Sequence, residues 1–146
     1  MRIRPMALGD ASAVAGLCTQ LGYPASPAEV ARRLAQLAQD TDNGLFVAEV
    51  SGGRVAGWVH VHGRHLLEVE PYAELGGLVV DEGHRGQGLG RALMAEAERW
   101  AAERGYGWLR IRSNTARAGA YHFYRQLGYD LVKSQHVFAK LLHGEQ

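Results

Sequence analysis

Glycines gather in one stretch of this chain, after a run of β-favouring residues that ends at Val80 and where a pattern of helical spacing begins. The glycines of this loop are Gly83, Gly86, Gly88 and Gly90. A glycine loop at the start of a helix presents unpaired backbone N–H groups and the positive end of the helix dipole, and it lets a ligand approach closely. We predict that this loop binds phosphate, with Arg85 and Arg91 within reach. The alternatives are a turn that only starts a helix and two solvated arginines.

Two common nucleotide-binding patterns do not fit these glycines. A Walker loop requires a lysine followed by Ser or Thr, and no such pair follows Gly86. The dinucleotide fingerprint GxGxxG also fails, because Gly86, Gly88 and Gly90 are spaced GxGxG. The loop therefore belongs to another class of phosphate site.

His60, His62 and His65 raise the question of a metal site. His60 and His62 share one face of a strand, because their spacing is two. No Cys or Asp completes a convincing ligand set, so we assign no metal and expect these histidines to line a substrate cleft or the sheet surface. Cys18 falls in an apolar helical stripe and is predicted to be a core residue.

Length and composition are those of a single soluble domain. A chain of 146 residues can bury about two thirds of its unfolded surface. Its 47% apolar and 21% charged residues are ordinary for a globular protein, and a net charge of +1 does not favour nucleic acid as a partner. One cysteine forms no internal disulfide, and we find no signal peptide and no membrane span, so we expect a cytoplasmic protein that contacts no membrane.

Hydrophobic periodicity and capping signals predict the elements that hold these residues. Ser26, Pro27 and Glu29 form a helix start with a capping box, and Asp10 is a predicted N-cap. In the first half we predict a strand over residues 1–6, helices over 10–21 and 27–39, and hairpin strands over 45–50 and 54–62. In the second half we predict a strand over 73–80, a helix to 104, a strand over 106–113, a helix over 116–127, and a final antiparallel pair over 129–132 and 135–142.

This order implies an α/β (α+β) fold with a central mixed, mostly antiparallel twisted sheet and helices on both faces, because hairpins pair antiparallel strands and a helical crossover makes parallel ones. Gly76 and Gly77 lie inside the central strand and indicate a bulge or the close approach of another chain. A packing kink against a bulky neighbour is the alternative. Simple alternation places Glu74 on the strand face of Leu78 and Val80.

Two motifs resemble those of the GNAT family of N-acetyltransferases. The first, RGQGLG over residues 85–90, is similar to the acyl-CoA loop of that family, whose amides hold the pyrophosphate of coenzyme A. The second spans residues 112–129, where Tyr124, Gly128 and Tyr129 match the end of the family's last motif. The chain departs from the family at Glu82, where many members have Pro, and at Arg117, where many have Asn. The pattern SNxxRxxAxxFY is similar to the aminoalkylphosphonate acetyltransferase branch.

The resemblance implies a single N-acetyltransferase domain over residues 1–146, with the acyl-CoA N-acyltransferase fold and acetyl-CoA as co-substrate. In the family the sheet splays after the central strand, and free backbone groups there bind the pantetheine arm. The cofactor-binding residues it implies are Leu78, Val79, Val80, Arg85, Gly86, Gln87, Gly88, Leu89, Gly90, Arg91, Asn114, Arg117, Tyr121 and Tyr124.

The resemblance also implies catalytic roles for two side chains. An attacking amine must be neutral, so its proton needs an acceptor, and Glu74 corresponds to the strand glutamate that serves as base in some members. Tyr124 is by position the family's acid, which protonates the departing sulfur. Both have plain alternatives, a solvated strand-start residue for Glu74 and a core tyrosine for Tyr124.

We therefore expect acetyl transfer from acetyl-CoA to a primary amine of a small molecule or peptide in a ternary complex. A non-catalytic acyl-CoA sensor or interaction module is the alternative. Inward-facing Glu68, Glu70 and Glu74 would suit a polycationic acceptor, whereas inward-facing Arg64, Arg117 and His65 would suit a phosphonate or carboxylate. Dimerisation is common in the family, and the sequence leaves a homodimer open.

Overall fold

The structure is a computed structural model that describes residues 1–112 and 119–143. The chain forms two compact units, Met1–Arg112 and Ser113–Gln146, and each is described by itself. The first contains a five-stranded sheet in the order β1-β2-β3-β4-β5. Its strands are β1 (Arg2–Pro5), β2 (Asn43–Glu49), β3 (Val55–Arg64), β4 (Tyr72–Val80) and β5 (Leu109–Ile111). Its helices are α1 (Ala11–Leu21), α2 (Pro27–Leu37) and α3 (Leu89–Glu103), with short 3-10 turns over Leu8–Asp10, Ser51–Gly53 and Glu82–His84.

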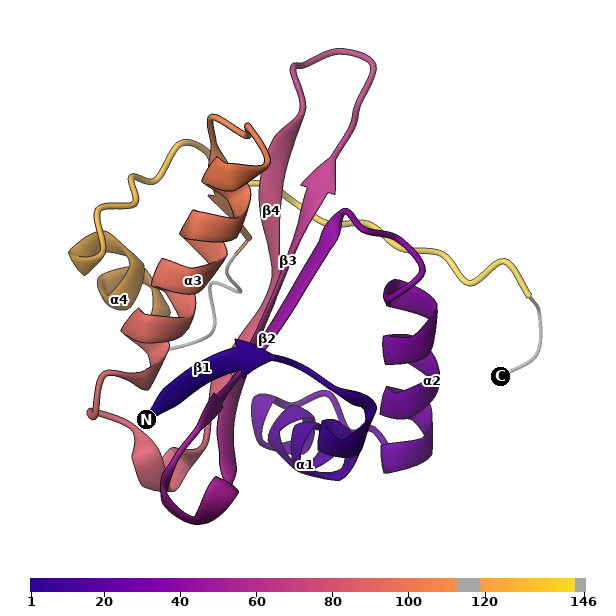
Figure 1. The fold of residues 1–146 in the computed structure, drawn as a ribbon. Helices are drawn as coiled ribbons and strands as arrows, with labels where there is room; N and C mark the ends of the chain where they lie inside the picture. Colours follow the sequence, from indigo (N-terminus) through magenta and orange to yellow (C-terminus); the bar gives the residue numbers. More distant parts are fainter. Residues whose placement is uncertain (113–118, 144–146) are drawn as a thin grey trace. The chain divides into compact units, whose positions relative to one another are not determined.

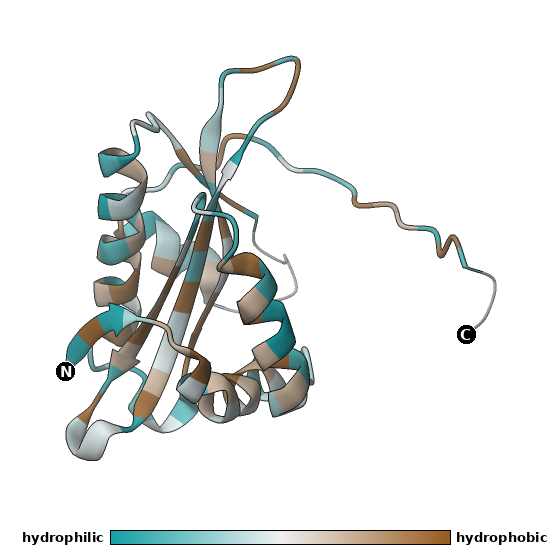
Figure 2. Cartoon of the chain, turned by 45° about the vertical axis from the view of Figure 1, so that its right-hand side comes forward, coloured by the Kyte–Doolittle hydropathy of each residue, from teal (hydrophilic) through white to brown (hydrophobic). Residues whose placement is uncertain are grey.

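Helices cover both faces of this sheet, as predicted (Figure 1). On one face Val14 of α1 and Val30 of α2 are buried with Val47 of β2, and Trp58 of β3 packs against them. On the other face α3 buries Leu93 and Met94. Figure 2 shows the apolar residues along the strands and the hydrophilic ones on the outer sides of the helices, so the sheet is the centre of the core.

Helix ends follow the capping signals with one difference. Ser26 Oγ accepts from the Glu29 amide at 3.1 Å, and the Glu29 carboxylate accepts from the Ser26 amide at 2.9 Å, which confirms the predicted capping box. Asp10 occupies the N-cap position of α1, but its side chain makes no capping bond there. The carboxylate instead accepts two bonds from the Arg4 guanidinium, each 2.9 Å long, because a buried carboxylate needs a charged partner.

The sheet is mixed, as predicted. Strands β1 to β4 pair antiparallel, and β4 pairs with β5 in parallel. His60 pairs with Gly77 and Val61 pairs with Leu75, so Gly76 is an extra residue in β4, which is a bulge at the predicted place. A Cβ on Gly76 would lie 2.7 Å from His60 Nδ1, and one on Gly77 would lie 2.7 Å from the Trp58 ring. The alternative explanation, packing against bulky neighbours, therefore holds as well.

The second unit contains one helix in its described part, α4 (Ala120–Gln126). The beginning of the helix predicted over 116–127 lies outside the described residues. The predicted final pair of strands is wrong, because residues 129–143 contain no strand. Side chains of this segment such as Val137 and Phe138 are 88% and 91% exposed, so the alternating apolar pattern here does not mark buried strands.

Candidate active site

The glycine loop joins β4 to α3 as the sequence predicts. Gly86 and Gly88 have φ values of +79° and +86°, a left-handed backbone that favours glycine, and Gly88 is the N-cap of α3. A Cβ added at either glycine would meet no atom within 4 Å, so the space beside them is open. The first amides of α3, those of Leu89, Gly90 and Arg91, have no helical carbonyl to bind. An anion of the size of a phosphate fits this arrangement.

The entrance of the loop is fixed to α1 by Gln20, which sequence analysis did not single out. Its side chain donates to Asp81 Oδ1 at 2.8 Å and accepts from the Glu82 amide at 3.0 Å. Asp81 also bonds His84 Nδ1 at 2.8 Å and the Gly83 amide at 3.2 Å. The hydrogen bond from Gln20, and to a smaller extent that from His84, holds the pKa of Asp81 below its ordinary value. A 3-10 turn thus enters the loop where many GNAT members have Pro.

Strand β4 lacks a neighbour beside this loop. It pairs with β5 only from Ala73 to Leu75, so within the described residues Gly76 to Val80 have no strand partner on that side. Leu78, Val79 and Val80, the strand residues predicted to bind the cofactor, all lie in this stretch. Their backbone groups on the β5 side are therefore available to another hydrogen-bonding chain.

Glu74 is buried on β4 and lies among basic side chains, which sequence analysis did not foresee. It is 8% exposed. Its Oε1 accepts from Arg112 Nε at 3.1 Å, and its Oε2 lies 3.8 Å from His62 Nε2 and 3.9 Å from Arg64 Nη1. The carboxylate is thus not a solvated strand-start residue.

The expectation that Glu74 shares a strand face with Leu78 and Val80 is wrong. Residues opposite each other on antiparallel strands share a face, and Glu74 lies opposite His62 whereas Leu78 lies opposite Val59. The extra residue at Gly76 changes the alternation, so Glu74 lies on the face of the histidines and of α1. Leu78 and Val80 lie on the face of α3.

His60 and His62 share one face of β3, as their spacing predicts, and this is the face of Glu74. Their ring centroids are 5.2 Å apart. His60 Nε2 bonds Asn43 Oδ1 at 2.8 Å, and burial, with a smaller contribution from His62, lowers the pKa of His60 to about 4. We call the following residues the polar cluster: Asn43, His60, His62, Arg64, Glu74 and Arg112.

The third histidine belongs to a different group, the tyrosine cluster, which consists of Asp42, His65 and Tyr106. The Tyr106 hydroxyl lies 2.8 Å from both carboxylate oxygens of Asp42, and His65 Nε2 lies 3.1 Å from Asp42 Oδ2 and from the Tyr106 hydroxyl. Burial, and to a smaller extent the hydrogen bond to Asp42, raises the pKa of Tyr106. Within the described part of the chain, no set of three His, Cys, Asp or Glu side chains could hold a metal.

Glu68 and Glu70 are exposed in the loop between β3 and β4.

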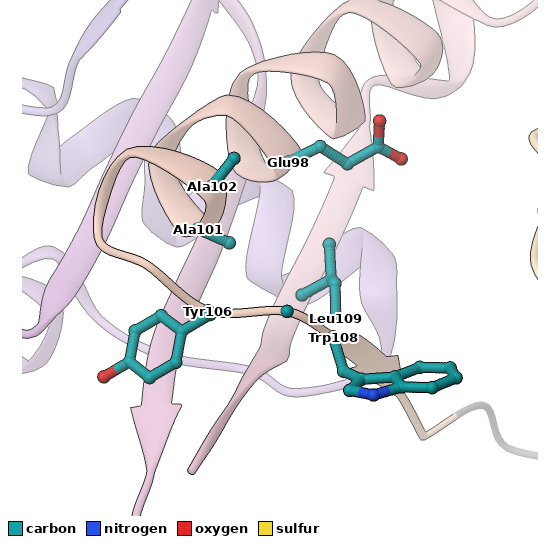
Figure 3. A pocket seen from close by; sticks show the side chains of 7 residues that line it. Glu98, Ala101, Ala102, Tyr106, Trp108 and Leu109 are labelled. Atoms are coloured by element: carbon teal, nitrogen blue, oxygen red, sulfur yellow. The ribbon is translucent and has the colours of Figure 1, made fainter.

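Tyr106 also borders a pocket beside the end of α3, with Ala101, Ala102 and Trp108 (Figure 3). The glycine loop is at the other end of this helix, which has 15 residues and is therefore about 22 Å long. The pocket therefore has no part in the candidate site.

The second unit holds Tyr124 and Tyr121 on α4. Tyr124 is half-buried and contacts the rings of Phe123 and Tyr129 edge to face, with centroids 5.1 and 6.1 Å away, and the Tyr129 amide donates to its carbonyl at 3.0 Å. Tyr121 is 61% exposed. Asn114 and Arg117 lie outside the described residues, so their proposed contacts stay predictions.

These features accompany a clear relationship in sequence. The chain belongs to the acetyltransferase (GNAT) family, whose family model matches residues 14–129. It is 36% identical over 94 residues to a streptothricin acetyltransferase of Streptomyces lavendulae, a match that covers 62% of this chain and 47% of that protein. It is 29% identical over 132 residues to an aminoglycoside N(6')-acetyltransferase type 1 of Stenotrophomonas maltophilia, covering 88% and 85% of the two chains.

Similarity in fold extends further than similarity in sequence. A crystal structure of a transcriptional regulator from Bacillus halodurans C-125 superimposes with a TM-score of 0.85 at 23% identity, over 95% of this chain and 99% of that one. The chain spans less than half the length of the first three curated relatives that it matches, 47%, 32% and 42%. None of the helices within residues 1–112 and 119–143 is long and apolar enough to span a membrane.

Proposed function

We propose that this protein transfers the acetyl group of acetyl-CoA to a primary amine of a small molecule or peptide, by direct attack in a ternary complex. The observation that carries the proposal is the glycine loop at the start of α3, next to a stretch of β4 that has no strand partner on its β5 side among the described residues. The open space at Gly86 and Gly88 suits the pyrophosphate, and the backbone of Leu78, Val79 and Val80 suits the pantetheine arm. Arg85 and Arg91 supply positive charge at the loop, and Gln87 is one of its members.

The reaction needs one proton acceptor and one proton donor. The nitrogen of the neutral amine forms a bond to the carbonyl carbon, and the amine loses a proton. Glu74 assists this deprotonation from the face of the histidines. The carbon–sulfur bond then breaks, and Tyr124, the acid that the family motif implies, gives the leaving sulfur its proton. The amide and free coenzyme A are the products, so no covalent enzyme intermediate is required.

The relatives suggest small-molecule acceptors, because their names refer to streptothricin and to aminoglycosides. The direct test measures thiol release from acetyl-CoA with kanamycin, spermidine, 2-aminoethylphosphonate, lysine and a peptide with a free N-terminus. We expect release with at least one of these amines and binding of coenzyme A by calorimetry. Binding without release from any amine would favour a non-catalytic acyl-CoA sensor, and absence of binding would reject the cofactor assignment.

Tyr124→Phe tests the donor. The variant keeps the ring and loses the proton, so we expect turnover to fall about 10²-fold or more while the affinity for coenzyme A stays unchanged. Tyr23→Phe, at a tyrosine that is 65% exposed, is the matched control. Unchanged turnover in Tyr124→Phe would remove Tyr124 from the mechanism.

A further inference from the structure

Two side chains of the polar cluster, His62 and Glu74, each have an atom that can accept a proton, and these two atoms lie near each other. His62 Nε2 and Glu74 Oε2 are 3.8 Å apart, which is too far for a direct hydrogen bond. The two residues lie directly opposite each other on β3 and β4. The His62 side chain is 24% exposed and that of Glu74 is 10% exposed, so the imidazole is the more accessible acceptor.

Hydrogen bonding decides which nitrogen of His62 is basic. His62 Nδ1 lies 3.3 Å from the Gly63 carbonyl oxygen, which can only accept, so Nδ1 carries the hydrogen. In the neutral ring the lone pair is then on Nε2, the nitrogen that faces Glu74. A proton that arrives at Nε2 would be stabilised by the buried carboxylate.

Glu74 itself is committed to other partners. Arg112 and Arg64 both approach its oxygens, so protonation of the carboxylate would leave two guanidinium groups facing a neutral acid. His60 does not compete either, because burial keeps it neutral near pH 7 and its Nε2 donates to Asn43. Among the described residues, the charged and titratable groups of this cluster around His62 are His60 and Arg64 of β3, Glu74 of β4, and Arg112, which bonds Glu74.

The polar cluster lies at the part of the sheet where the pairing between β4 and β5 ends. Pairing between β4 and β5 ends at Leu75, one residue after Glu74. A Cβ added to Gly76, the first described residue of β4 without a strand partner on that side, would lie 2.7 Å from His60 Nδ1. In the proposed function the acyl arm lies along this same stretch of β4. An amine that attacks the thioester near the bulge would therefore approach from the region of His60 and His62.

We propose that His62 Nε2 accepts the proton of the acceptor amine, and that Glu74 is a positioning residue that stabilises the resulting imidazolium. This inference rests on the proposed function. As the carbon–nitrogen bond forms, the electron pair of the breaking N–H bond stays on nitrogen and the proton moves to Nε2. The imidazolium later gives this proton to water, so His62 is regenerated in each turnover.

The first experiment measures kcat/KM against pH with the amine of the panel that gives the most thiol release. We expect His62→Gln to lower kcat about 10²-fold or more and to remove the acid limb of the profile, with KM for acetyl-CoA unchanged. Glu74→Gln should lower kcat less and keep the acid limb. His65→Gln is the matched control, because His65 belongs to the tyrosine cluster, and it should keep the wild-type profile.

A second measurement is independent of turnover. Nitrogen chemical shifts of the imidazoles in the wild-type protein should assign the neutral His62 as the Nδ1–H form. Imidazole in the buffer should restore part of the activity of His62→Ala, provided that this variant melts like the wild type.

The outcomes separate the two levels of the proposal. Failure of the wild type to acetylate any amine would overturn the proposed function and this inference with it. Three other outcomes would overturn this inference alone. They are wild-type turnover in His62→Gln, loss of the acid limb in Glu74→Gln instead, and an Nε2–H form of neutral His62.

Discussion

The polar cluster and the tyrosine cluster each combine a carboxylate with histidine, yet they differ in how their polar atoms are satisfied. In the tyrosine cluster, one carboxylate, one phenol and one imidazole all bond one another within 3.1 Å. In the polar cluster, His62 and Glu74 lie too far apart to bond, and Arg64 Nε is buried with no hydrogen-bond partner among the described residues. Polar groups whose hydrogen bonds are all made within the protein suit a structural role, whereas polar groups with unused hydrogen-bonding capacity suit the binding of a ligand.

Gly63 of β3 lies against the tyrosine cluster and gives the largest expected effect. A Cβ at this position would lie 2.0 Å from both Asp42 Oδ2 and the Tyr106 hydroxyl. We expect Gly63→Ala to break the tyrosine cluster and to lower the free energy of unfolding by about 3 kcal/mol, measured in urea. Gly107→Ala is the control, because a Cβ there meets nothing within 4 Å. A stable Gly63→Ala protein would show that the tyrosine cluster contributes little.

Gly76 tests the polar cluster in the same way. A Cβ there would push against His60 Nδ1, whose ring is held by Asn43, so the ring and its neighbour His62 must move. We expect Gly76→Ala to lower kcat/KM about 10²-fold, because small displacements of reacting groups are costly in rate. Melting temperature should change less than in Gly63→Ala. Equal losses of stability in the two variants would remove the distinction between the clusters.

His60 makes stability depend on pH. Its pKa of about 4 in the folded protein is below the ordinary value of 6.5, so between these values the unfolded chain binds more protons and stability falls as pH falls. Because the ring is partly exposed, we expect a loss of roughly 2 kcal/mol between pH 7 and about pH 4.5.

The measurement compares urea unfolding of the wild type and His60→Gln at both pH values. The variant should lose less stability on acidification, because it has no imidazole to charge at this site. His122→Gln, at an exposed position of α4, should follow the wild type. Parallel losses in the wild type and His60→Gln would mean that His60 is already accessible to protons.

Local signals in the sequence predicted the features that depend on a few consecutive residues. The Ser26 capping box, the start of α3 after the glycine loop and its end near Gly105 each arise from backbone conformation within a short segment. The bulge was also indicated by Gly76 and Gly77. Such features need no information about the register of distant strands.

The contents of the polar cluster could not be predicted in this way. One extra residue at Gly76 reverses the alternation of β4, so the face of Glu74 relative to Leu78 depends on register and not on spacing. Its partner Arg112 comes from the far end of β5. Apolar alternation after Tyr129 likewise expresses strand propensity, but propensity alone does not make a strand, and residues 129–143 form none.

The smallest expected effect concerns the hydroxyl of Tyr106. Tyr106→Phe removes a donor to Asp42 but keeps the stacking on Trp100, whose ring centroid is 6.2 Å away. We expect a loss of about 1 kcal/mol in the free energy of unfolding, and unchanged kcat/KM, because the cluster lies outside the proposed reaction. Tyr23→Phe, which removes an exposed hydroxyl, should change neither quantity. A fall in kcat in Tyr106→Phe without a loss of stability would place the tyrosine cluster in the reaction. Fully satisfied hydrogen bonding would then no longer distinguish a structural cluster from a reactive one.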